Sequence, residues 1–121
     1  MESGKIEVTE WTNYGLAARL KAAAMGVPYV PARNILGTDT LKYSAAKVVE
    51  CPFTGKRLTL LPALYPDVGI IHVHEADVYG NARIKGILIM DGDLSKAAKH
   101  LILTTERLIS NDEIRRDPTS T

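Results

Sequence analysis

The nine residues Val68–Ala76, VGIIHVHEA, restrict the fold more than any other segment of the chain. Side chains alternate between the two faces of a strand, and here the first positions are apolar on both faces. Apolar residues on both faces are typical of a strand with neighbours on either side. The segment therefore predicts a central strand of a sheet.

A helix is predicted over residues 10–25, where apolar residues recur every four positions among many alanines. Thr9 is the expected N-cap, and Gly26 is the expected residue just beyond the helix. Pro28 follows at a position where a helix cannot continue.

The rest of the chain predicts short elements. Residues 34–46 have no clear period and predict a long loop, and Asp93 predicts the start of a short helix through residue 99. Residues 82–90 are interrupted by Gly86 and predict either two strands or one with a bulge. Further short extended segments are expected over residues 6–8, 28–32, 47–50, 57–61, 100–105 and 107–109.

These elements predict an α/β domain with an open mixed sheet and flanking helices. We expect the domain to cover residues 1–110, and residues 111–121 to form a polar, disordered tail.

Composition excludes several classes of protein. The 121 residues carry a formal net charge of +1, which argues against a nucleic-acid partner. The polar first residues predict no signal peptide, and no apolar run is long enough to span a membrane. The single cysteine, Cys51, excludes an internal disulfide and fits a reducing compartment. We therefore expect a cytoplasmic protein.

His72 and His74 share one face of the predicted strand, roughly 7 Å apart, as two metal ligands could. A zinc site needs further ligands, and Glu75 points to the opposite face, so we expect hydrogen-bonded histidines and no metal. His74, Glu75 and Asp77 lie near the C-terminal end of the strand, where open α/β sheets bind ligands. An equally strong interpretation gives Asp77 the role of holding the turn that follows.

Arg33, Glu10 and the segment 54–57 each have a functional and a structural interpretation. Arg33 could clamp a carboxylate or phosphate, or form a salt bridge with a carboxylate such as that of Asp39. Glu10 could act as a general base, although a favourable charge at a helix start is the better interpretation. Residues 54–57, TGKR, lack the glycine and hydroxyl residue of a phosphate-binding loop and predict a β-turn.

Several motifs in order resemble a known family: GVPYVPARNILGTD (residues 26–39), PFTG (52–55), PALYPDVGIIHV (62–73) and ADVYGNA (76–82). Together they resemble the A subunit of family I coenzyme A transferases of the glutaconate CoA-transferase type. The resemblance covers nearly the whole chain but implies an incomplete, interior piece of that subunit.

The resemblance implies the open α/β fold of these transferases and an enzyme that moves CoA from an acyl-CoA to a carboxylic acid. It implies coenzyme A as a substrate, no other cofactor, a hetero-oligomer, and a catalytic glutamate on a partner B subunit. No catalytic residue is then expected in this chain. The implied substrate pocket contains Asn13, Arg33, Gly37, Thr38, Asp39, His74, Glu75, Asp77 and Asn81.

Two alternatives remain. A related branch hydrolytically opens rings of steroid-derived CoA thioesters with an acidic residue on the helix that matches residues 10–25, where Glu10 is the only acid. Thr12 and Asn13 stand where a second acid could be, which favours the transferase. The other alternative is a non-catalytic remnant that only binds a partner.

Overall fold

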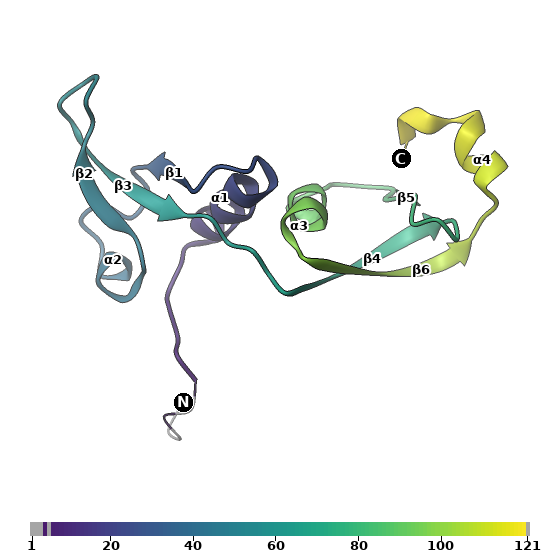
Figure 1. The fold of residues 1–121 in the computed structure, drawn as a ribbon, viewed down its shortest axis with the longest axis horizontal. Helices are drawn as coiled ribbons and strands as arrows, with labels where there is room; N and C mark the ends of the chain where they lie inside the picture. The colour runs from purple at the N-terminus through teal and green to yellow at the C-terminus, as the bar shows by residue number, and fades with distance from the viewer. Residues whose placement is uncertain (1–3, 5, 121) are drawn as a thin grey trace. The chain divides into compact units, whose positions relative to one another are not determined.

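The computed structural model describes residue 4 and residues 6–120, and it divides the chain into two compact units. The first unit is Met1–Leu64 and the second is Tyr65–Thr121. Each unit has its own three-stranded sheet (Figure 1). The predicted α/β class is confirmed, and the predicted strands are distributed over two sheets.

The first unit begins with helix α1, Asn13–Ala24, whose N-cap is Thr12. Thr12 Oγ1 accepts hydrogen bonds from the Gly15 N–H (3.0 Å) and from Asn34 Nδ2 (2.7 Å). The helix ends where predicted, because Gly26 adopts a φ of 70°, a conformation that glycine tolerates without strain.

An antiparallel sheet follows α1, with strands β1 (Tyr29–Ala32), β2 (Lys47–Glu50) and β3 (Arg57–Pro62) in the order β1-β3-β2. The four-residue helix α2, Thr40–Tyr43, lies between β1 and β2 in the sequence. The core of the unit contains Ala18, Ala32, Ile35 and Leu61.

The second unit contains β4 (Val68–Ala76), β5 (Ala82–Arg83), α3 (Asp91–Ala97), β6 (His100–Leu108), α4 (Asn111–Arg116) and the 3₁₀ helix η1 (Pro118–Ser120). Strand β4 is central, as predicted: it pairs in parallel with β6 and in antiparallel with β5. This sheet is therefore mixed. One face of β4 buries Ile71, Val73 and Glu75, while Val68 and Ile70 on the other face are exposed.

The start of the chain differs from the prediction. Residues 6–8 form no strand, since no described strand pairs with them, and Ile6 and Val8 are exposed. Helix α1 starts three residues later than predicted because Thr12, not Thr9, caps it. Glu10 therefore precedes the helix and does not supply a charge to its first turn.

The later elements also differ in their bounds. Residues 84–90 extend no sheet, because the strand after the turn at residues 77–81 pairs with only the last two residues of β4. Helix α3 begins at Asp91, before the predicted cap Asp93. Residues 111–116, expected to lack structure, form α4, whose N-cap Ser110 accepts a hydrogen bond from the Glu113 N–H.

Among the described residues, none of the helices is both long and apolar enough to cross a bilayer.

Candidate functional site

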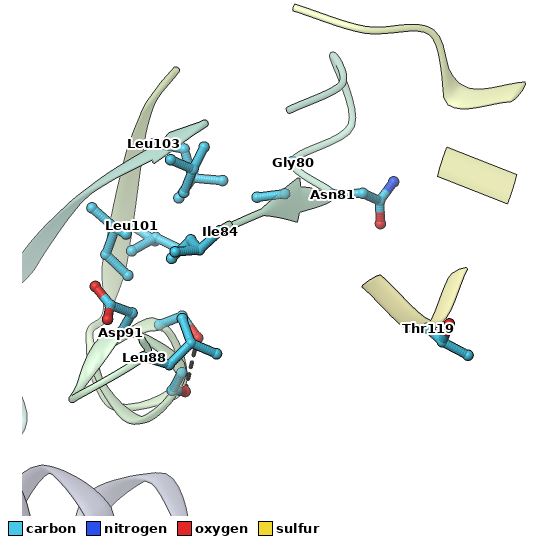
Figure 2. A pocket seen from close by; sticks show the side chains of 13 residues that line it. Gly80, Asn81, Ile84, Leu88, Asp91, Leu101, Leu103 and Thr119 are labelled. Atoms are coloured by element: carbon cyan, nitrogen blue, oxygen red, sulfur yellow. Dashed lines mark hydrogen bonds between the residues drawn. The ribbon is translucent and has the colours of Figure 1, made fainter. Parts of the chain in front are cut away.

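An apolar hollow of about 570 Å³ lies in the second unit, on the buried face of the β4–β6 pair. Figure 2 shows Ile84, Leu101 and Leu103 close together, with Leu88 and Asp91 nearby. The hollow is lined by Ile71, Val73, Gly80, Asn81, Ala82, Ile84, Leu88, Asp91, Gly92, Ser95, Leu101, Leu103 and Thr119. We call it the apolar hollow. Its volume lies within the range of small-molecule sites, and its wall is mainly apolar with a few polar groups.

The turn after β4 forms one end of the apolar hollow and is organised by Asp77. Asp77 Oδ1 accepts hydrogen bonds from the N–H groups of Tyr79 (2.9 Å) and Asn81 (3.0 Å). Its Oδ2 accepts from the side-chain amides of Asn111 and Asn81, both at 2.8 Å. These bonds, the one from Asn111 foremost, lower the pKa of Asp77 to about 2. The structure thus gives Asp77 the turn-holding role that was its alternative interpretation, while Asn81 lines the hollow.

Glu75 is a buried carboxylate surrounded by cations. Its Oε1 accepts hydrogen bonds from Lys85 Nζ (2.7 Å) and Arg107 Nη2 (2.6 Å), and its Oε2 lies 3.8 Å from Arg83 Nη1. The hydrogen bonds from Lys85 and then Arg107 lower the pKa of Glu75 to about 2. A carboxylate held ionised in this way cannot readily accept a proton at neutral pH, so it is poorly suited to general acid–base catalysis.

Arg83 links this cluster to the C-terminal helix. Its Nη2 donates hydrogen bonds to the carbonyl oxygens of Glu113 (3.1 Å), Ile114 (3.2 Å) and Asp117 (2.7 Å). A cation at the last carbonyls of a helix stabilises its C-terminus. Arg83 therefore positions α4 beside β5.

A second, charged hollow of about 540 Å³ adjoins Glu75. It is lined by Glu75, Arg83, Ile84, Lys85, Arg107 and Asp117. Ile84, the residue after β5, lines both hollows, so the charged hollow adjoins the apolar hollow. The side chains of Lys85 and Arg107 are more than half exposed, whereas Glu75 is buried.

The two histidines of β4 are hydrogen-bonded. His74 Nδ1 accepts a hydrogen bond from the Lys85 N–H (3.1 Å), which places the proton of the neutral ring on Nε2. His72 Nδ1 lies 2.8 Å from Thr104 Oγ1 on the parallel neighbour β6. Within the part of the chain that the structure describes, no group of three or more His, Cys, Asp or Glu side chains could hold a metal ion.

Three of the candidates in the first unit share a hollow. Gly37, Thr38 and Asp39 line a hollow of about 590 Å³, with Leu36, Leu41, Lys42 and Arg57. Asp39 forms its ion pair with Lys42 (2.6 Å) and not with Arg33, the partner considered from the sequence. Asp39 is the N-cap residue of the short helix α2, and the three-residue spacing across its first turn brings Asp39 and Lys42 together.

Three further candidates are exposed. Asn13 is the first residue of α1, and Arg33 follows β1 directly. Glu10 uses its N–H to bond to the Tyr43 carbonyl (3.0 Å) and has an exposed side chain.

Sequence reasoning did not identify Arg83, Lys85 and Arg107 as a cluster. Arg83 and Lys85 alternate in the segment that follows the turn, and this alternation was a usable signal. The place of Arg107 depends on the register of β6, which sets it opposite Glu75. A parallel register between strands separated by a helix cannot be read from local sequence.

The family model described as "Coenzyme A transferase" matches residues 1–121, the whole chain. A protein of Archaeoglobus fulgidus with no characterised function is 56% identical over 119 residues, which cover 98% of this chain and 27% of that protein. The A subunit of 3-oxoadipate CoA-transferase from Pseudomonas knackmussii is 36% identical over 107 residues, which cover 88% of this chain and 38% of the relative.

The crystal structure of glutaconate coenzyme A-transferase from Acidaminococcus fermentans matches with a TM-score of 0.89 and 31% identity. The match covers 98% of this chain and 43% of that chain. The chain thus spans less than half the length of these relatives.

Proposed function

Because the chain belongs to the coenzyme A transferase family, we propose that it forms part of the A subunit of a CoA-transferase. The enzyme moves CoA between an acyl-CoA and a carboxylic acid. The observation that carries this proposal is the match of the family model to all 121 residues, together with similarity to the A subunit of 3-oxoadipate CoA-transferase.

The proposed chemistry uses a glutamate carboxylate of a partner B subunit. Its oxygen attacks the thioester carbonyl, breaks the C–S bond and forms a mixed anhydride with release of the CoA thiolate. The thiolate then attacks the glutamyl carbonyl, which releases the first acid as its carboxylate and leaves a glutamyl-CoA thioester. A second carboxylate reverses these steps, so one difficult exchange becomes a series of easier ones.

In this proposal the chain supplies part of the substrate pocket and no catalytic residue. The paired, ionised state of Glu75 and the four hydrogen bonds to Asp77 support this division, because neither group is free to act as a nucleophile. Coenzyme A is a substrate, and no other cofactor is proposed. The complex is a hetero-oligomer, and the unpaired thiol of Cys51 is consistent with a cytoplasmic location.

Reconstitution tests the proposal. We expect the isolated chain to show no exchange of CoA between an acyl-CoA and a free acid, and co-expression with a family B subunit to produce exchange. A B subunit whose catalytic glutamate is changed to Gln is the matched control and should abolish it. Exchange by the isolated chain, or none with an active B subunit that binds it, would refute the proposal.

The ring-opening hydrolase is distinguished with the same complex. Glu10→Gln should leave CoA exchange unchanged, because the Glu10 side chain is exposed and precedes α1. Loss of turnover with folding intact would instead favour the hydrolase, in which an acid at this helix carries the chemistry.

A further inference from the structure

The apolar hollow contains no cation among its described lining residues. Its wall is formed mainly by the aliphatic side chains of β4, β6 and the segment around Ile84. Of the lining residues that the structure describes, Asp91, at the start of α3, is the ionisable one. The charge of this surface is therefore negative or neutral, in contrast to the adjoining charged hollow.

We propose, on the basis of the function proposed above, that the apolar hollow receives the acyl group of the thioester and selects acyl groups without a distal carboxylate. The occupant is an uncharged, apolar acyl chain. This class differs from the dicarboxylates glutaconate and 3-oxoadipate that appear in the names of two relatives.

The aliphatic wall supplies the first part of the selection. Ile71 and Val73 are buried and form a core cluster with which Ile84 and Leu103 pack. An acyl chain in the hollow covers the apolar lining side chains that are still exposed, Leu88 at 58% and Leu101 at 37%, and so removes apolar surface from water on both sides. A terminal carboxylate in the same place loses its hydration and finds no cationic partner.

Asp91 supplies the second part. Its Oδ2 accepts a hydrogen bond from the Ile89 N–H (3.3 Å), which holds the carboxylate at the segment that enters α3. A distal carboxylate in the hollow would face this like charge. The cations that line the adjoining hollow already have partners. Lys85 and Arg107 are hydrogen-bonded to Glu75, and Arg83 donates to the carbonyl oxygens of residues 113, 114 and 117.

A substitution at Leu88 can test the preference of the apolar hollow for uncharged acyl groups. It lines the apolar hollow and is 58% exposed, so a longer polar side chain can replace it without opening the core. Ile87 is 90% exposed and does not line the hollow, which makes it the matched control position.

Calorimetric titration of the chain with pentanoyl-CoA and glutaryl-CoA tests the proposal. These thioesters differ only in a terminal methyl group against a terminal carboxylate. We expect pentanoyl-CoA to bind at least about tenfold more tightly, the lower end of what pocket chemistry of this kind provides. Leu88→Lys should reduce or invert this ratio by supplying a cation, Asp91→Asn should reduce it, and Ile87→Lys should leave it unchanged.

The outcomes are separable from those of the proposed function. Equal or tighter binding of glutaryl-CoA, a ratio that Leu88→Lys does not change, or no binding of either thioester overturns the acyl-selection proposal. The reconstituted complex can still exchange CoA in each of these cases. Loss of exchange with selective binding intact would refute only the transferase.

Discussion

Glu75 makes the stability of the second unit depend on pH. The carboxylate receives hydrogen bonds from Lys85 and Arg107, which lower its pKa from 4.5 to about 2. A group whose pKa falls on folding stabilises the protein above its unfolded pKa, and this contribution disappears as the pH falls through the folded pKa. We therefore expect Glu75 to stabilise the fold at neutral pH and to lose that effect between pH 4.5 and about 2.

Two measurements check this prediction. A carbon-13 NMR titration of the Glu75 carboxyl should give a midpoint near 2, and a midpoint at or above 4.5 would contradict it. Thermal unfolding should show Glu75→Gln less stable than wild type at pH 7, with the difference decreasing below pH 4.5. Asp77 has a similarly lowered pKa, and the comparison removes its contribution because both proteins contain it.

At the scale of the element, Thr12 determines where α1 begins. Its hydroxyl oxygen caps the Gly15 N–H and also accepts from Asn34, which ties the helix start to the segment after β1. Thr12→Ala should cost about 1 kcal/mol of stability in the first unit. Thr9, the cap expected from the sequence, instead accepts a hydrogen bond from Trp11 Nε1, so Thr9→Ala should have little effect.

Urea unfolding followed by fluorescence checks this pair of substitutions, because Trp11 is the only tryptophan and lies against the core of the first unit. If Thr9→Ala were as destabilising as Thr12→Ala, the result would contradict this prediction and support Thr9 as the N-cap.

An element can be predicted from the sequence when the residues that determine it are close together in the chain. The apolar pattern of Val68–Ala76 and the glycine after α1 are local signals, and both predictions are confirmed. The predicted N-cap, Thr9, is wrong because Thr9 and Thr12 are chemically equivalent in the sequence. In the structure Thr12 caps the Gly15 N–H and is also held by Asn34, 22 residues away. Helix α4 depends on Arg83, which bonds to its carbonyls from 30 or more residues upstream.

At the scale of the whole molecule, the site was less predictable than the fold. The sequence indicated Glu75 near the end of β4 and Asp77 and Asn81 after it. The structure joins Asp77 and Asn81 through the turn, whereas Glu75 bonds to Lys85 and Arg107. The apolar hollow beside them was not anticipated, because its wall combines β4, β6 and the segment before α3. Such a wall depends on the parallel register of two strands, which no single segment encodes.

The outer face of the second unit's sheet predicts that the 121-residue chain associates with itself. Val68 and Ile70 of β4 and Ile102 of β6 are 52%, 66% and 48% exposed, and Ile70 lies opposite Ile102 in the register. Strand β6 is also an edge strand, and exposed apolar edges pair with other chains. Multi-angle light scattering should show a mass above that of the monomer, rising with concentration.

Substitutions identify the surface that associates. Ile70→Lys places a charge in the middle of the apolar outer face, where its side chain is already exposed, so it should shift the chain toward the monomer without unfolding it. Ile87→Lys adds the same charge to an exposed residue outside the sheet and should leave the mass unchanged. A monomeric wild-type chain at all concentrations would show that the exposed face is too small to hold two copies together, since stable interfaces bury about 1,200 Å² or more.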